Sequence, residues 1–364
     1  MMAGFECAAH RLRDGRRLDL TASTGHDRRA EEDFRLVAAH GMKAVRDGLN
    51  WHRIEHRPGQ YDWSSLLPVL RAARDTGTTV VWDLLHYGIP DDIDPFGAGF
   101  VRRFATFARH AARVIAGETD EAPVFTPINE ISFWAFAGGE TGGLNPFAFY
   151  RGADLKRQLV RAALAATAEV RAVDSRARIA CAEPLIHVFP ASTDEAAIDS
   201  AMLHSQAQYE ALDMLMGLQA PELGGHDDAV DIVGLNYYHN NQWIDGGRSV
   251  PAGEWLHRPL HHLLAEAVGR HGKPAYIAET GCEGVFRPHW LRYIADEVRA
   301  AHANGVAVGG ICLYPIISHL GWDDDRHCAN GLIGGHHPEA PRSPYPPLAR
   351  EIIEQSALFA GKPA

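Results

Sequence analysis

The stretch TTVVWDLL, which runs from Thr78 to Leu85, is mostly apolar and rich in β-branched residues. A run of this length and composition predicts a strand buried on both faces, as in a parallel sheet covered by helices. Gly77 stands just before it and is a typical end for a helix that Ser64 and Ser65 would open. A helix followed by a buried strand is the repeating unit of an α/β fold.

The same alternation of short apolar runs and longer helical stretches continues on both sides of this strand. We expect strands at 3–7, 43–46, 78–85, 124–128, 178–182, 231–235, 275–278 and 306–313. We expect helices at 27–40, 64–76, 100–114, 153–173, 194–218, 259–270, 287–304 and 347–359, where 194–218 is one long helix or a pair of helices. This pattern favours an α/β fold with one domain over residues 1–364, a (β/α)8 TIM barrel. The alternative is an open, doubly wound sheet, but its usual GxGxxG fingerprint after the first strand is missing.

The composition indicates a globular protein that binds neither nucleic acid nor a membrane. The 364 residues carry a formal net charge of −11, and 46% of them are hydrophobic. Nucleic acid and anionic membrane surfaces favour basic patches, and none stands out in this sequence. No apolar run approaches the roughly 18 residues that span a bilayer.

The cysteines and the start of the chain indicate a compartment. Five scattered cysteines without a CxxC pair are typical of reduced thiols rather than disulfides. The first ten residues lack the basic start and the apolar run of a secretory signal. We therefore expect a cytoplasmic protein. The sequence indicates no cofactor and leaves the oligomeric state open.

Polar residues follow the predicted strands at the ends where the catalytic groups of a barrel are found. Two of them are carboxylates, Glu130 after the fourth strand and Glu279 after the seventh. The others are one cation and several hydrogen-bonding or aromatic residues: Arg46, His86, Tyr87, Asn129, Asn236, Tyr237, Tyr238, Tyr314 and Trp322.

This set of residues suits the hydrolysis of a glycoside with retention of configuration. That reaction needs two carboxyl groups about 5–5.5 Å apart, one ionised and one protonated. The fourth and seventh strands lie on opposing sides of an eight-stranded barrel, so Glu130 and Glu279 would face each other. A cation such as Arg46 would keep one carboxylate ionised, while burial would raise the pKa of the other. Aromatic rings offer flat faces to a sugar, and Asn, His and Arg bind its hydroxyl groups.

Six short motifs surround these residues: VRDGLNWHRIE (45–55), LLHYGIP (84–90), TPINE (126–130), DIVGLNYY (231–238), IAETG (277–281) and GICLYPIISHLGW (310–322). In order and spacing they resemble the motifs of glycoside hydrolase family 1, the β-glucosidase and 6-phospho-β-glucosidase group of clan A. The resemblance implies a TIM barrel and a retaining β-glycosidase that acts on a small-molecule glycoside without a metal.

The resemblance also implies a role for each matched residue. Glu279 would be the nucleophile and Glu130 the acid/base catalyst. Arg46 would lie beside the nucleophile, Tyr238 would hydrogen-bond it, and Asn129 would bind the sugar 2-hydroxyl. The remaining matched residues would contact the substrate: His86, Tyr87, Asn236, Tyr314 and Trp322.

The chain departs from the family pattern around the sugar pocket. Ile131 follows the acid/base glutamate in place of a proline, and Tyr87 and Tyr314 replace two tryptophans. Gly321 replaces a glutamate that holds the sugar, and Glu6 is the best candidate for a missing glutamine of the first strand. We therefore expect conserved chemistry on an altered sugar.

An acidic run follows Trp322 and bears on the choice of sugar. Asp323, or its neighbours Asp324 and Asp325, is a candidate to supply the contact that Gly321 has lost. The same negative charges argue against a 6-phospho sugar, because they would repel the phosphate.

Other chemistries have weaker support. The adjacent pairs His261-His262 and His336-His337 do not have the i, i+4 spacing that lets two histidines of one helix face a single metal. No GxSxG motif marks a serine nucleophile. Two alternatives to hydrolysis stay open: a carbohydrate-binding barrel that has lost turnover, and a transglycosidase that uses the same residues.

Overall fold

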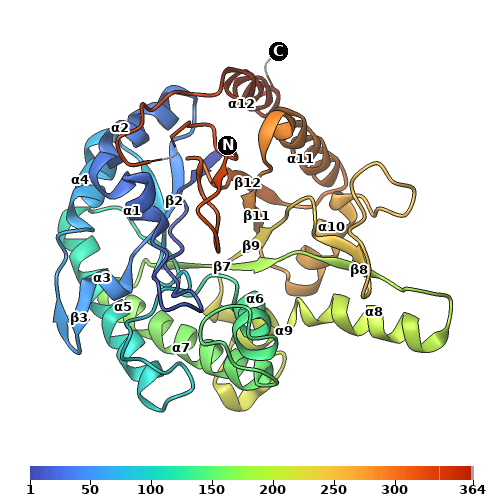
Figure 1. Cartoon of the computed structure of the whole chain (residues 1–364), viewed down its shortest axis with the longest axis horizontal. Coiled ribbons are helices and arrows are strands. Elements are labelled where there is room, and N and C mark those ends of the chain that lie inside the picture. The colour runs from blue at the N-terminus through green and yellow to red at the C-terminus, as the bar shows by residue number, and fades with distance from the viewer. Residues whose placement is uncertain (336, 362–364) are drawn as a thin grey trace.

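The computed structural model describes residues 1–335 and 337–361, so residues 336 and 362–364 of the predicted domain lie outside it. Eight parallel strands close into a barrel, in the order β1, β2, β5, β6, β7, β9, β11, β12 and back to β1 (Figure 1). Their bounds are β1 Met2–Gly4, β2 Ala44–Gly48, β5 Thr79–Asp83, β6 Val124–Thr126, β7 Arg178–Pro184, β9 Ile232–Asn236, β11 Ala275–Thr280 and β12 Val308–Leu313. The (β/α)8 prediction is confirmed, and the open sheet is ruled out.

Helices surround the barrel on its outside (Figure 1). The main ones are α2 His26–Ala39, α4 Leu67–Thr76, α5 Gly99–Glu118, α7 Gly152–Val173, α8 Glu195–Ala207, α9 Glu210–Leu215, α10 Leu260–His271, α11 Arg287–Ala303 and α12 Pro346–Phe359. None of the helices in the described part of the chain is long and apolar enough to cross a membrane.

The local sequence explains most of these elements. The stretch that begins at Thr78 forms β5, which pairs with β2 in register from Ala44 with Thr79 to Gly48 with Asp83. Gly77 ends α4 with φ 65°, a left-handed conformation that favours glycine. The serines predicted to open this helix do not, because α4 begins two residues later, at Leu67, without a side-chain cap.

The structure corrects several predicted bounds. The region 194–218, expected as one long helix or a pair, forms a pair, α8 and α9. The fourth strand ends at Thr126 rather than at residue 128, and the second continues to Gly48, so Arg46 lies within it and not at its end.

Short elements that were not predicted follow the barrel strands. Helix α6 (Ile131–Trp134) leads directly into a π-helix, η1 (Ala135–Glu140), after β6. The first connection contains α1 (Leu20–Thr24) and the second contains α3 (Trp51–Ile54). Three small strand pairs also form: β3 (Glu55–Arg57) with β4 (Gln60–Tyr61), β8 (His187–Phe189) with β10 (Gln242–Ile244), and β13 (His319–Leu320) with β14 (His327–Cys328).

Candidate active site

Glu279 lies in β11 and is held by a cation and a phenol. Arg46 of β2 donates from Nη1 to Oε1 of Glu279 at 2.7 Å. Tyr238, two residues after β9, donates its hydroxyl to Oε2 at 2.9 Å. Both Arg46 and Glu279 are buried, so water screens their ion pair little. Each oxygen of the Glu279 carboxylate therefore has its own donor.

Arg46 has a second carboxylate partner that the sequence did not indicate. Asp83, at the end of β5, accepts from Nε at 2.9 Å and from Nη2 at 2.7 Å. This bidentate pair fixes the plane of the guanidinium group. The only sequence signal for it is a single acid inside an otherwise apolar strand.

Glu130 follows β6 and has a different environment. Tyr87 donates its hydroxyl to Oε2 at 2.7 Å, and Asn236 donates from Nδ2 to Oε1 at 2.9 Å. Both partners are neutral, so Glu130 has no counterpart to the arginine beside Glu279. The backbone of Glu130 has φ 44° and ψ 61°, a left-handed conformation that is uncommon for glutamate.

Asn129 connects the surroundings of the two glutamates. Its Oδ1 accepts from Arg46 Nη2 at 2.6 Å. Its Nδ2 lies 3.1 Å from His86 Nε2 and donates to the Tyr87 hydroxyl at 3.0 Å. The structure thus brings Arg46, His86, Tyr87, Asn129 and both glutamates into one hydrogen-bonded network.

Burial raises the pKa of both glutamates above the ordinary carboxyl value. At Glu279 the charge of Arg46 opposes this effect, and the charge of Glu130 adds to it. At Glu130 the hydrogen bonds from Tyr87 and Asn236 oppose it, and the charge of Glu183 adds to it. Among the described residues, Arg46 is the only direct cationic partner of the two carboxylates, so we assign the first ionisation to Glu279.

Glu183, in β7, is a further buried carboxylate that the sequence did not indicate. It accepts hydrogen bonds from the backbone N–H groups of Ile131 at 2.7 Å and Ser132 at 3.0 Å. Burial raises its pKa to about 7. These N–H groups begin α6 directly after Glu130, so Glu183 anchors the segment that carries Glu130. The isoleucine supplies an N–H that a proline at this position would lack.

Glu6, His86 and Tyr314 gather beside Arg46. Tyr314 donates its hydroxyl to Oε1 of Glu6 at 3.4 Å, and Nε2 of His86 lies 3.7 Å from the same oxygen. The ring of Tyr314 is parallel to that of His86 and lies over the Arg46 guanidinium, 5.4 Å from its carbon. All three predicted substrate contacts are thus buried near the glutamates.

An aromatic layer covers Tyr87. The rings of Phe133, Trp134 and Trp322 pack against it with centroid separations of 6.0, 5.7 and 5.5 Å. His10, which was not predicted, packs against Trp322 at 5.2 Å. Asp323 lies farther out, exposed, and lines a cavity on the outer side of this layer.

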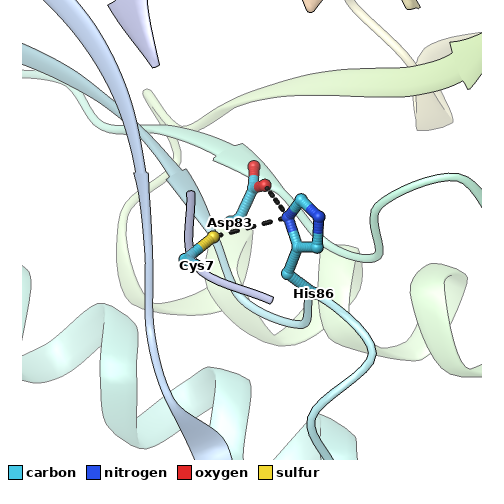
Figure 2. A group of neighbouring side chains, drawn as sticks. All are labelled: Cys7, Asp83 and His86. Carbon is cyan, nitrogen blue, oxygen red and sulfur yellow. Dashed lines mark hydrogen bonds and ion pairs between the residues drawn. The ribbon is translucent and has the colours of Figure 1, made fainter. Parts of the chain in front are cut away.

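Among the described residues, one group has the donors for a metal ion: Cys7, Asp83 and His86. Figure 2 shows the Cys7 thiol and the Asp83 carboxylate both directed at Nδ1 of His86, at 3.4 and 3.1 Å. The group fits a metal poorly, because Asp83 is already paired with Arg46 and burial raises the pKa of Cys7 to about 11. Of the adjacent histidine pairs, His261 bonds Glu297 at 2.9 Å, and His336 lies outside the described residues.

Solved structures resemble the chain over most of its length. The AHE enzyme of Alicyclobacillus herbarius matches it with a TM-score of 0.80 at 18% identity, over 93% of this chain and 88% of that one. The family 1 β-glucosidase of Thermotoga maritima matches with a TM-score of 0.77, and its complex with glucoimidazole with 0.78, at the same identity and coverage. The chain has the fold of the family 1 β-glucosidases. At this identity the likeness establishes the fold alone. No protein-family model and no curated protein matches the sequence.

Proposed function

We propose that the chain is a retaining β-glycosidase, with Glu279 as nucleophile and Glu130 as acid/base catalyst. The observation that carries the proposal is the unequal environment of the two glutamates. Glu279 receives a charged donor and a phenol, whereas Glu130 has only neutral donors. Two carboxyl groups in environments that separate their protonation states are what double displacement requires.

In the first step, a carboxylate oxygen of Glu279 attacks the anomeric carbon. The bond between that carbon and the leaving oxygen breaks, and Glu130 gives its proton to the leaving oxygen. The products are a glycosyl ester on Glu279 and the free alcohol. Arg46 and Tyr238 hold the Glu279 carboxylate in place for the attack, and Arg46 favours its ionised form.

In the second step, Glu130 is a carboxylate and removes a proton from water. The water oxygen attacks the anomeric carbon, the ester bond to Glu279 breaks, and the sugar leaves with its original configuration. Asn236 donates to Glu130 and also offers a buried Oδ1 that has no partner among the described residues. We assign this oxygen to a sugar hydroxyl.

A carbohydrate-binding barrel without turnover is the second candidate, and one observation favours it. Tyr87 is fully buried and its hydroxyl occupies Oε2 of Glu130. A proton donor engaged in this way reacts only if the Tyr87 bond yields to the leaving oxygen. A transglycosidase uses the same first step, with a second sugar in place of water.

The test compares two variants on aryl β-glycosides of glucose, galactose, fucose, mannose and xylose. We expect Glu279→Gln to lose turnover by at least about 10³-fold with every leaving group, because the nucleophile is gone. Glu130→Gln keeps activity only on substrates with acidic phenols, which leave without a proton. Normal turnover by Glu279→Gln would overturn the mechanism, and a wild-type protein that binds these sugars without cleaving them would establish the second candidate.

A further inference from the structure

A cavity of about 480 Å³ lies against the outer side of the aromatic layer that covers Tyr87. Its walls come from the segment 10–16 after β1, from α6, η1 and the loop 143–147, and from Trp322 and Asp323. A volume of this size suits a small molecule or a part of one.

The cavity is placed on the side of Glu130. Phe133 and Trp322 line it and also pack against Tyr87, whose hydroxyl bonds Glu130. Glu130 is the group that gives its proton to the leaving oxygen in the proposed function, on which this inference rests. Phe133 and Trp322 separate Tyr87 from the cavity, so the leaving group of a bound glycoside would have to pass their rings to reach it.

Arg11, Arg13 and Arg16 all line the cavity, and they differ in how their charges are balanced. Arg11 lies 3.6 Å from Asp91, and Arg16 pairs with Asp14 at 3.4 Å and Asp325 at 3.2 Å. Asp14 and Asp323 are the acidic groups on the same walls. With the partners Asp91 and Asp325 counted, the three guanidinium groups face four carboxylates among the described residues, so the wall has no excess positive charge and its unpaired cation is Arg13 alone.

Of these three arginines, Arg13 is the one that lacks a carboxylate partner among the described residues. Its Nη2 donates to the Gly142 carbonyl, and its guanidinium lies over the ring of Phe147, 5.0 Å from the centroid. These contacts hold the exposed side chain at the cavity, where no carboxylate of the described residues pairs with it. A planar, positively charged group beside Phe133 and Phe147 matches a ligand that joins an aromatic ring to a carboxylate.

His10 gives a second, independent indication of a ligand. The side chain is 3% exposed and lines the same cavity, and its Nδ1 has no hydrogen-bond partner among the described residues. The ring also has a hydrogen bond to the backbone of Trp322. Burial lowers the pKa of His10 to about 4, so the ring is neutral at pH 7. A hydroxyl group satisfies such a nitrogen in either tautomer, since it both donates and accepts. A glycoside brings hydroxyl groups to this position.

We propose that this cavity binds the leaving group of an aromatic-acid glycoside, with the carboxylate on Arg13 and the ring against Phe133 and Phe147. The substrate class is thus a β-glycoside whose sugar is attached to the phenolic oxygen of a hydroxylated aromatic carboxylic acid. Hydrolysis would release the free phenolic acid and the sugar.

Binding is tested with uncleavable probes, so that the outcome does not depend on turnover. The probes are 4-carboxyphenyl and 4-carbamoylphenyl 1-thio-β-D-glucoside and the corresponding galactosides, titrated calorimetrically into the full chain. We expect the acid to bind about tenfold more tightly than the neutral amide, and the preference to shrink as salt is added. Arg13→Met should remove the preference. Arg35→Met, an equal charge loss at an exposed residue on the outer helix α2, should keep it.

Equal affinity for acid and amide, the absence of binding by both, or a preference that survives in Arg13→Met would overturn this proposal. Its failure is separate from that of the proposed function. Hydrolysis of neutral aryl β-glycosides without a carboxylate preference would leave the mechanism standing and reject the cavity assignment. A carboxylate preference in binding, without hydrolysis of any aryl glycoside, would support the cavity assignment and reject the proposed mechanism.

Discussion

Glu183 and Tyr87 act on the acidity of Glu130 in opposite directions. The charge of Glu183 raises the pKa of Glu130, and the hydrogen bond from Tyr87 lowers it. Glu130 must hold a proton to act as an acid, so its pKa sets the alkaline limit of the reaction. These two neighbours can be changed separately.

We expect Glu183→Gln to move the alkaline limb of the kcat/KM profile to lower pH, by about 0.5–1 unit. The pKa of Glu183 is raised to about 7, so the residue is charged on the alkaline limb, and its removal makes Glu130 lose its proton more easily. Glu169→Gln, which removes a partly exposed carboxylate paired with Arg109 on the outer helix α7, is the control and should leave the limb in place. A merely structural role would reduce kcat/KM at every pH without a shift.

We expect Tyr87→Phe to move the same limb in the other direction. The phenol stabilises the ionised form of Glu130, so its loss raises the pKa of that carboxyl and keeps it protonated to higher pH. Asn236 and His86 still face Glu130 in this variant and should limit the shift to less than about 1 unit. The pH dependence of kcat/KM is the measurement, and a shift to lower pH would contradict the assignment.

The sequence could place Glu130, Glu279 and Arg46 because each sits in a recognisable motif. It could not indicate Asp83 or Glu183. Glu183 accepts a hydrogen bond from the backbone N–H of Ile131, which is 52 residues away in the sequence. No local sequence pattern marks such a contact. Whether the predicted residues carry out the roles assigned to them stays a prediction.

At the scale of elements, His26 ties α2 to the barrel. Its Nδ1 lies 2.8 Å from Asp33 of the same helix, and its Nε2 lies 2.9 Å from Asp47 of β2. Arg342 also pairs with Asp33, at 2.6 Å. All four side chains are buried. The contacts with Asp47 and Asp33 raise the pKa of His26 to about 9 against the loss of solvation.

This pKa predicts a pH dependence of stability. In the unfolded chain His26 has its ordinary pKa of 6.5, so the stabilisation by its charged form is complete below that pH and is lost as the pH rises to about 9. A pKa raised from 6.5 to about 9 corresponds to roughly 3 kcal/mol in the free energy of unfolding. Urea unfolding from pH 6 to 9.5 measures it.

His26→Gln should be less stable than the wild type at pH 6 and should lose most of this decline with pH. His56→Gln, a change at an exposed histidine of β3, should keep the decline. A wild-type stability that stays flat or rises from pH 6.5 to 9 would refute the charged state of His26.

The alternation of strands and helices predicted the main elements well, and it missed the short ones after the strands. Helix α6 and the π-helix η1 fill residues 131–140, where no regular pattern was recognised. Helix α6 has only four residues, too few for a periodic apolar stripe. Its first two N–H groups are instead satisfied by Glu183, a contact that depends on the closed barrel.

At the scale of the whole molecule, the barrel closes because its first strand, β1, pairs with its last strand, β12. β1 pairs with β2 on one side and with β12 on the other, where Met2 is opposite Cys312. The count of eight units favoured this closure, but the pairing of strands some 310 residues apart is set by packing and not by a local pattern. Closure brings Glu6 to Tyr314 and Arg46 to Glu279.

The central claim is that Glu279 forms a covalent bond to the sugar, and trapping that bond tests it most directly. A 2-deoxy-2-fluoro β-glycoside with a good leaving group, on the sugar that the aryl panel selects, slows the second step so that the ester accumulates. Proteolysis and mass spectrometry then locate the added mass. We predict that it lies on Glu279, within the segment Ile277–Gly281. A label on Glu130 or on any other residue would contradict the account.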